Sequence, residues 1–344
     1  MLKSLVELLL PGQSYIISAI FWINPFMNSN HSFIGSNVAL ITPMFADGAV
    51  DYEALNQLID FHIDAGTSSI VAVGTTGESA TVGVKEHLKI INHTVKYASK
   101  RIPIIAGTGA NSTSEAIELT QEALNLGADA CLLVTPYYNK PTQEGLFQHF
   151  KLIAESVNID QILYNVPGRT AVNMSVDITS RLSQIPNIIG IKDATGDLSV
   201  IKHLVEKCPD DFLLLTGDDA TAVDFLIAGG HGGISVTANI VPKELQKVYL
   251  SAIAGNVELA KNLNSKLENF HKNLFIEANP IPVKWALHKM GKCEKGIRLP
   301  LLELSDEFKL IIEQDLKELN LIWKKSIIEH DLKELKLVWK KLIT

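Results

Sequence analysis

The sequence predicts an α/β protein, a (β/α)8 TIM barrel with a C-terminal helical extension. The first observation behind this prediction is that eight short apolar runs, each about as long as one strand, lie between residues 37 and 238. The second is that amphipathic segments with the period of a helix separate these runs. Eight strands that alternate with helices are typical of a closed parallel barrel, whereas the alternative, a doubly wound sheet, would not ordinarily need eight such units.

The eight expected strands are rich in Val, Ile, Leu and Ala, and they lie at 37–42, 68–74, 102–109, 128–134, 161–166, 188–195, 212–219 and 232–238. The clearest of the intervening helices are expected at 52–65 and 112–126, where apolar residues recur with the period of a helix. The second of them begins around Asn111 and Ser112 and carries Glu115 in its first turn. A polar N-cap followed by an acidic first turn is typical of a helix start.

The two ends of the chain differ from the repeating middle. After Pro242 the pattern is helical throughout, so we expect the barrel to span 32–255 and a helical segment to fill 256–344. We expect residues 1–31 to be an appended, poorly ordered leader, and Met27 within it is an alternative start of the protein. Neither of the two apolar stretches in this leader reaches the roughly 18 residues that a membrane span needs.

The C-terminal tail contains a duplication. Residues 311–325 recur almost unchanged at 327–341, an offset of 327 − 311 = 16 residues. Such an offset rotates a position on a helix by about 160°, so one straight helix cannot present both apolar stripes to the same surface. We expect Leu316, Leu319 and Trp323 of the first copy to dock against the body, and the second copy to be a functionally idle duplication that is mobile or packs only loosely.

Composition excludes several classes of function. The chain has 344 residues and a net charge of −7, so it lacks the basic surface that neutralises phosphates, and we expect no nucleic-acid partner and no membrane partner. Its three cysteines are far apart, which favours a reducing, cytoplasmic location and no disulfide framework. The ten histidines show no paired spacing, so we expect no metal site.

The most informative stretch is NIIGIKDATG at 187–196, because its apolar residues predict a buried strand that contains Lys192. Side chains alternate along a strand, so Gly190, Lys192 and Ala194 share one face, and the two small neighbours leave room for a long amine. Burial disfavours the charged form of a lysine, and a neutral amine can form a Schiff base with a carbonyl substrate. Taken alone, the stretch also fits a strand-end lysine that reaches solvent.

Other polar motifs follow the expected strands. GTTGES at 74–79 places hydroxyls and backbone N–H groups in a turn that suits a carboxylate, although it also describes an ordinary loop. Tyr137 and Tyr138 follow the fourth run, and Tyr164 and Arg169 come from the fifth run and the loop after it. Phenols and a guanidinium at one barrel mouth can transfer protons and bind a carboxylate, whereas tyrosines that pack at a subunit interface are the structural alternative.

Five motifs in order resemble those of the dihydrodipicolinate synthase family of pyruvate-dependent class I aldolases: GTTGES, TPYYN, YNVPGRT, GIKDATG and ISVTAN. The resemblance runs from about residue 35 to about residue 323. It implies a Schiff-base condensation of pyruvate with L-aspartate 4-semialdehyde, which is the entry step of the diaminopimelate route to lysine. It also implies that no metal and no organic cofactor takes part.

The resemblance implies roles for individual residues. Lys192 would form the imine with pyruvate, and Thr75 and Thr76 would hold the pyruvate carboxylate. Tyr164 would pass protons to and from the Schiff base and would be linked through Thr76 to Tyr138. Tyr138 would reach into the site of a neighbouring subunit, so the dimer would be the smallest complete catalyst, and dimers would pair into a homotetramer.

Substrate choice depends mainly on one of the remaining residues. The resemblance implies that Arg169 binds the carboxylate of aspartate semialdehyde and that Ile234 contacts bound pyruvate. Neuraminate lyase and the 2-keto-3-deoxy sugar acid aldolases share the same scaffold, lysine and tyrosine, and a related lyase that acts on a sugar acid is the alternative function. Arg169 favours the short anionic aldehyde. A catalytically inactive barrel that only binds ligands is the alternative from a different class.

Some members of the family are inhibited by lysine that binds at a dimer interface. The positions that match this regulatory pocket are Ser79, Ala80, His87, Asn111, Glu115 and Tyr137. Val84 stands where inhibited members have a histidine, so the sequence leaves lysine inhibition undecided.

Overall fold

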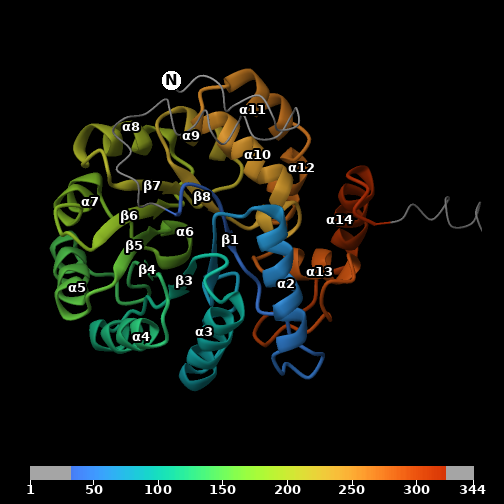
Figure 1. The fold of residues 1–344 in the computed structure, drawn as a ribbon, viewed down its shortest axis with the longest axis horizontal. Helices are drawn as coiled ribbons and strands as arrows, with labels where there is room; N and C mark the ends of the chain where they lie inside the picture. Colours follow the sequence, from blue (N-terminus) through green and yellow to red (C-terminus); the bar gives the residue numbers. More distant parts are fainter. Residues whose placement is uncertain (1–31, 323–344) are drawn as a thin grey trace, which may run out of the picture. The chain divides into compact units, whose positions relative to one another are not determined.

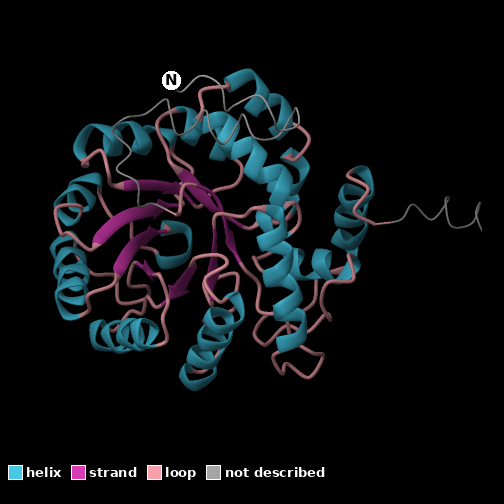
Figure 2. Ribbon diagram, in the orientation of Figure 1, coloured by secondary structure: helices cyan, strands magenta, loops and turns pink. Residues whose placement is uncertain are grey.

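The structure is a computed structural model, and it describes residues 32–322. Within this range the chain forms a closed barrel in which each strand pairs with the next and β8 pairs in parallel with β1. The strands are β1 (Gly35–Ala39), β2 (Ser69–Ala72), β3 (Ile104–Gly107), β4 (Ala130–Val134), β5 (Asp160–Asn165), β6 (Ile188–Asp193), β7 (Leu213–Thr216) and β8 (Gly232–Ser235). The predicted (β/α)8 barrel is therefore confirmed, and the strands occupy the centre of the ribbon in Figure 2.

Helices surround the strands, as Figure 1 shows. Those that follow successive strands are α2 (Tyr52–Ala65), α3 (Val84–Ala98), α4 (Thr113–Asn125), α5 (Gln143–Ser156), α7 (Val176–Leu182), α8 (Leu198–Lys207), α9 (Ala222–Ile227) and α10 (Pro242–Ile253). Two short elements, α6 (Pro167–Thr170) and the 3-10 helix η1 (Thr237–Asn239), lie in loops after β5 and β8. The C-terminal extension contains α11 (Val257–Asn264), α12 (Glu268–Asn273), α13 (Ile281–Lys289) and α14 (Asp306–Glu318).

Local signals in the sequence place the helix ends. The Asp51 carboxylate accepts from Ala54 N at the start of α2, and Gly66 ends that helix in the left-handed region with φ 76°. The helix predicted at 52–65 has these bounds. Ser112 caps α4 by accepting from Glu115 N, as the sequence indicated.

The expected strands were too long at their carboxyl ends. The run at 212–219 forms a strand only over Leu213–Thr216, and the run at 232–238 only over Gly232–Ser235. Residues 217–219 belong to the loop after β7, and residues 236–238 belong to the loop after β8, which contains η1. The first run was extended past its apolar part into Gly217, Asp218 and Asp219, whereas Val236 and Ala238 continue the apolar composition of the second run beyond the end of its strand.

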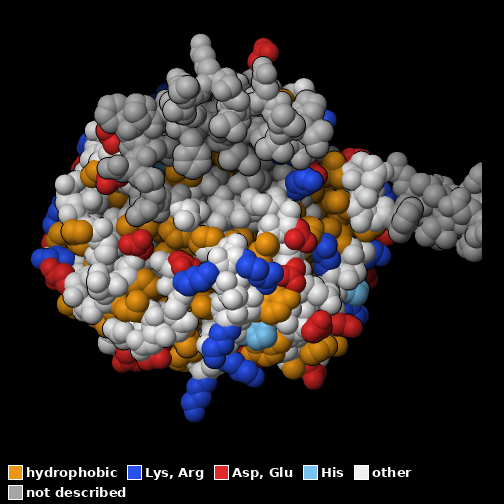
Figure 3. Space-filling model, viewed as in Figure 1, with side chains coloured by type: hydrophobic (Ala, Val, Ile, Leu, Met, Phe, Trp, Pro, Cys, Tyr) orange, Lys and Arg blue, Asp and Glu red, His pale blue; other side chains and the backbone are white. Residues whose placement is uncertain are grey.

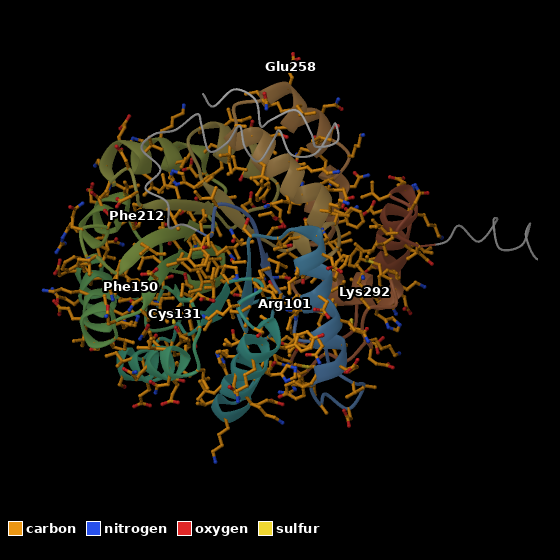
Figure 4. All side chains as sticks on the ribbon, in the orientation of Figure 1. Arg101, Cys131, Phe150, Phe212, Glu258 and Lys292 are labelled. Atoms are coloured by element: carbon orange, nitrogen blue, oxygen red, sulfur yellow. The ribbon has the colours of Figure 1, made fainter. Side chains whose placement is uncertain are left out.

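Three apolar clusters hold the barrel together. One fills the barrel interior and contains Ile105, Leu132, Tyr164 and Leu215. The other two lie between strands and helices, and Phe150 and Phe212, labelled in Figure 4, belong to the one beside α5, α7 and α8. Because both faces of every strand are covered, the strands read as continuous apolar runs.

The first copy of the tail repeat docks as expected. Leu316 of α14 is fully buried, and Leu319, just past the end of α14, packs against the same core. Helix α14 packs against α12 and α13. The leader 1–31, Trp323 and the second copy at 327–341 lie outside the described residues.

Candidate active site

A cavity of about 170 Å3 lies at the carboxyl ends of the strands. Every strand of a parallel barrel ends at this face, so the residues that follow different strands converge there. Polar side chains that line this cavity come from the turn after β2, from β5 and β6, from the loops after β5 and β7, and from the C-terminal extension. They are Thr75, Thr76, Tyr164, Arg169, Lys192, Asp218 and Asn279.

Lys192 lies near the end of β6, and its side chain is only 6% exposed. Burial lowers the pKa of its amine to about 7; the negative charge of Asp219 opposes this shift, and the positive charge of Arg169 adds to it. A substantial fraction of the amine is therefore neutral at pH 7, whereas an exposed lysine is neutral in only about one molecule in 2,500. The alternative of a strand-end lysine in solvent is wrong.

The space for Lys192 comes from Gly217, which follows β7. A Cβ atom at Gly217 would lie 2.5 Å from Lys192 Cε and 2.8 Å from the Cβ of Ala194. Gly190, which the sequence suggested as the source of this space, instead lets β7 approach, because a Cβ there would lie 2.6 Å from the Cβ of Leu213. The residue whose lack of a side chain makes room for the Lys192 amine is therefore Gly217, directly after the end of the neighbouring strand β7.

Tyr164 lies beside Lys192 because the register of β5 and β6 pairs the two residues. Lys192 Nζ is 4.3 Å from the centroid of the Tyr164 ring. Burial raises the pKa of the Tyr164 phenol, while the charge of Arg169 and the hydroxyl of Thr75 lower it, and the net shift is upward. The phenol therefore carries its proton at neutral pH and can donate it.

The two threonines of GTTGES have different partners. The Thr75 hydroxyl contacts the Tyr164 phenol. Thr76 is buried, and its hydroxyl oxygen accepts a hydrogen bond from Asn279 Nδ2 at 2.9 Å. Of the two threonines, Thr75 is therefore the one whose hydroxyl contacts the Tyr164 phenol, whereas the expected link placed Thr76 there; the onward link to Tyr138 stays a prediction. The physical reason is that neighbouring residues of a turn point in different directions.

Asn279 is a site residue that the sequence analysis missed. It precedes Pro280 in the loop between α12 and α13, and its backbone carbonyl accepts from Arg169 Nη2 at 3.2 Å. One residue of the C-terminal extension thus contacts both the GTTGES turn and Arg169. A signal was present in the sequence, because an Asn followed by Pro-Ile-Pro marks a fixed turn rather than a helix interior.

Asp219 is a second residue without an assigned role in the sequence analysis. It is buried, and its Oδ2 accepts from Val236 N at 3.0 Å and from Thr237 N at 2.9 Å. These bonds connect the loop after β7 to the loop after β8, and Val236 lines the cavity. The carboxylate also favours the protonated form of Lys192.

Two expected site residues do not line the cavity of this chain. Tyr138 is 91% exposed, has a left-handed backbone with φ 72°, and has no hydrogen-bonding partner in the part of the chain that the structure describes. Ile234 is buried in the interior cluster that contains Tyr164, and Val236 rather than Ile234 contributes to the wall.

Five of the six expected regulatory residues fall into two groups, and Ala80 belongs to neither. Ser79 and His87 line the cavity that contains Lys192, and His87 Nε2 lies 2.7 Å from Gly107 O. Asn111 Nδ2 donates to Tyr137 O at 3.2 Å, and the charge of Glu115 acts on the Tyr137 phenol. Ala80 is exposed. Val84, at the start of α3, is also exposed.

Charges on the surface are mixed. Lys and Arg are interspersed with Asp and Glu on the face shown in Figure 3. Within residues 32–322 no group of three or more His, Cys, Asp or Glu side chains is placed to hold a metal ion. None of the helices in this range is long and apolar enough to cross a membrane.

Comparison with known proteins gives consistent results. The model of the dihydrodipicolinate synthetase family matches residues 32–319. A 4-hydroxy-tetrahydrodipicolinate synthase from Ruthia magnifica subsp. Calyptogena magnifica is 62% identical over 296 residues, which are 86% of this chain and 100% of that protein.

Solved structures agree with these sequence matches. A chloride-inhibited dihydrodipicolinate synthase from Acinetobacter baumannii, crystallised with pyruvate, is 55% identical with a TM-score of 0.83, over 84% of this chain and 100% of the other. A dihydrodipicolinate synthase from Cyanidioschyzon merolae with lysine bound is 35% identical with a TM-score of 0.83, over 85% of this chain and 100% of the other.

Proposed function

The chain belongs to the dihydrodipicolinate synthetase family, and we propose on that basis that it condenses pyruvate with L-aspartate 4-semialdehyde to 4-hydroxy-tetrahydrodipicolinate. The single structural observation that supports this most is the buried amine of Lys192, whose pKa is lowered to about 7. A neutral amine at the end of a barrel strand is the nucleophile that an imine mechanism needs. The Acinetobacter baumannii relative was crystallised with pyruvate.

The first half of the reaction activates pyruvate. Lys192 Nζ attacks the keto carbon of pyruvate, and loss of water gives the imine. The hydroxyls of Thr75 and Thr76 and the N–H groups of their turn hold the pyruvate carboxylate. Tyr164, beside Lys192 in the register of β5 and β6, donates and accepts the protons of these steps. Loss of a methyl proton then converts the imine into an enamine.

The second half forms the carbon–carbon bond and the ring. The enamine carbon attacks the aldehyde carbon of aspartate semialdehyde, while Arg169 holds the carboxylate of that substrate. The substrate amine then attacks the imine carbon, a new C–N bond forms, and the bond to Lys192 Nζ breaks. The six-membered ring leaves, and Lys192 is again a free amine. No step needs a metal or an organic cofactor.

Assembly and location are part of the same proposal. Tyr138 is exposed in its own chain, and it would complete the site of a second subunit in a dimer, with two dimers forming a homotetramer. Analytical ultracentrifugation at micromolar concentration would measure the size of the assembly. The three free thiols of Cys131, Cys208 and Cys293 suit a reducing compartment, and we place the protein in the cytoplasm.

A surface near Asn111 and Tyr137 is a candidate site for regulation by lysine. The Cyanidioschyzon merolae relative was crystallised with lysine bound. The candidate surface here contains Asn111 and Tyr137, which are hydrogen-bonded, with Val84 in place of a histidine. Isothermal titration calorimetry with lysine, on this chain and on a Val84→His variant, would show whether this surface binds lysine and whether the histidine matters.

The imine is tested by trapping. Reduction with borohydride in the presence of pyruvate should add one pyruvate adduct per chain, and peptide mass spectrometry should place it on Lys192. A Lys192→Arg variant keeps the charge but cannot form an imine, because a guanidinium stays protonated. An adduct on another lysine in this variant would show that the assignment is wrong. Absence of any adduct on the wild-type protein would instead favour a barrel that only binds ligands.

A further inference from the structure

Helix α14 contains most of the first copy of the tail repeat, and it packs against α12 and α13, as Figure 1 shows. Its inner side buries Ile312 and Leu316 completely, and Leu319 packs against the same core. The part of α12 and α13 that α14 covers is called the tail-docking surface below. Apolar contact alone would let a helix slide along such a surface, so polar contacts must fix its position.

Two polar contacts fix the register of α14 on the tail-docking surface. Asn273 Nδ2, at the end of α12, donates to Asp315 Oδ2 at 2.7 Å. Lys289 Nζ, at the end of α13, lies 3.4 Å from Glu313 Oε1. Asp315 is buried, so a segment that docks here must offer a carboxylate at this position with apolar side chains around it.

The second copy of the repeat contains every residue that makes these contacts. Residues 311–325 and 327–341 differ at only three of fifteen positions, and none of the three is a contact position named above. Each contact residue recurs 16 positions later, and the matching residues are Ile328, Glu329, Asp331, Leu332 and Leu335. The tail-docking surface therefore has two matching segments in one chain.

Two of the three differences are compatible with docking. His330 replaces Gln314, which is exposed and bonds to Glu318 of its own helix at 3.1 Å. Val338 replaces Ile322, which is half-buried, so the change removes one methylene from a partial contact. Neither change places a charge or a larger side chain against the buried contacts of α14.

Other positions favour the first copy over the second. Asn320 has a left-handed backbone with φ 57°, which asparagine adopts more readily than Lys336, the residue at the matching position. Phe308, half-buried against the core, precedes the first copy, and the chain has Lys324 at the matching position. The first copy is therefore the preferred occupant, and the second copy is a weaker one.

We propose that residues 327–341 are an alternative occupant of the tail-docking surface and that they replace the first copy within the same chain. Leu304 is buried just before α14, so the exchanged state has residues 305–326 as a loop. The entropy cost of closing a loop rises only slowly with its length, so a loop of this size permits the exchange. This inference does not depend on the proposed activity.

The exchange gives the second copy a role that the sequence alone did not indicate. Helices α12 and α13 flank the loop in which Asn279 bonds to Thr76. A second matching segment keeps these two helices covered when the first copy is damaged or displaced. The duplication is then a spare docking segment rather than an idle one.

Three full-length variants test the exchange through stability, measured by urea denaturation. Leu332→Asp should be silent, because the first copy stays docked, and Leu316→Asp should lose little, because the second copy brings Leu332 to the surface. Combining both changes leaves no intact copy, so the folded-to-unfolded ratio should fall roughly 30-fold or more below that of Leu316→Asp, as expected for loss of a buried leucine. Leu310→Asp, alone and with Leu332→Asp, is the matched control, because Leu310 is 73% exposed on the same helix.

Carbodiimide cross-linking tests the exchange directly and without added residues, because Lys289 and Glu313 are close enough for a zero-length amide link. Wild-type protein should give the link from Lys289 to Glu313. The Leu316→Asp variant should give the link from Lys289 to Glu329 instead. The two glutamates lie in different tryptic peptides, so mass spectrometry distinguishes the two links.

Three outcomes would overturn the inference. A loss in Leu316→Asp as large as in the double variant would show that the second copy does not reach the surface, and a double variant as stable as the wild type would show that neither leucine fills it. Persistence of the Lys289–Glu313 link in Leu316→Asp, with no link to Glu329, would exclude the exchange. A Lys289–Glu329 link between isotopically labelled and unlabelled chains would assign the occupant to a second copy of the protein.

Discussion

Lys284 and Glu78 form an ion pair in the protein interior, with side chains only 3% and 0% exposed. Glu78 is the acidic residue of GTTGES and has a left-handed backbone with φ 61°, and its second carboxylate oxygen accepts from Arg298 N at 3.1 Å. Burial lowers the pKa of Lys284, and the charge of Glu78 opposes that shift. The turn that carries Thr75 and Thr76 is therefore held by residues of the C-terminal extension.

Breaking this pair should destabilise the protein and disturb pyruvate binding. Lys284→Met leaves a buried carboxylate without its cation, which typically costs about 3–5 kcal/mol. Adding Glu78→Gln removes the unpaired charge and should recover part of this loss. Chemical denaturation would measure stability, and the KM for pyruvate would report the position of the turn. If Lys284→Met is as stable as wild type, the pair does not hold the turn.

Lys192 should make the stability of the protein depend on pH in a defined direction. Its pKa falls from 10.5 in the unfolded chain to about 7 in the folded protein, so between these values the unfolded chain binds more protons. The stabilising contribution is complete above pH 10.5 and is lost as the pH falls to about 7. Relative to Lys192→Met, the wild type should gain about 1.4 kcal/mol per pH unit within this window.

This prediction is measured by urea denaturation of both proteins at several pH values from 7 to 10. The comparison with Lys192→Met removes the contribution of all other titrating groups, because they are common to both proteins. Parallel stability curves for the two proteins would mean that Lys192 keeps an ordinary pKa in the folded state.

Arg169→Ala should separate the two substrates. Arg169 is proposed to bind only the carboxylate of aspartate semialdehyde, and loss of a charge-assisted contact costs about 1.5–3 kcal/mol, or roughly 10- to 150-fold in binding. Steady-state kinetics should therefore show a large rise in the KM for aspartate semialdehyde and a small change for pyruvate. Similar changes for both would contradict this role.

Tyr138 should act in the site of a second subunit. A Tyr138→Phe variant and a Lys192→Ala variant should each be nearly inactive, and refolding them together should restore part of the activity, because some hybrid sites then contain both wild-type groups. Mass spectrometry under native conditions would confirm that hybrids form. Hybrids without activity would place Tyr138 outside the neighbouring site.

Local patterns in the sequence determined the barrel and its central residue. Strand and helix periods depend on residues a few positions apart, so the eight strands and the helix at 52–65 could be read directly. The alternation of side chains along β6 likewise put Lys192 on the inner face with Gly190 and Ala194. Tyr164 could be predicted as a neighbour of Lys192, because the carboxyl ends of all strands of a parallel barrel lie at the same face.

Only the tertiary structure decided which residues complete the site. Asn279 contacts Thr76 across 203 residues of sequence, and Lys284 contacts Glu78 across 206. No local pattern encodes such pairs, since they depend on how the C-terminal extension closes over the barrel mouth. The choice of Thr75 over Thr76 as partner of Tyr164 has the same cause, because the direction of a side chain in a turn is set by what packs against that turn.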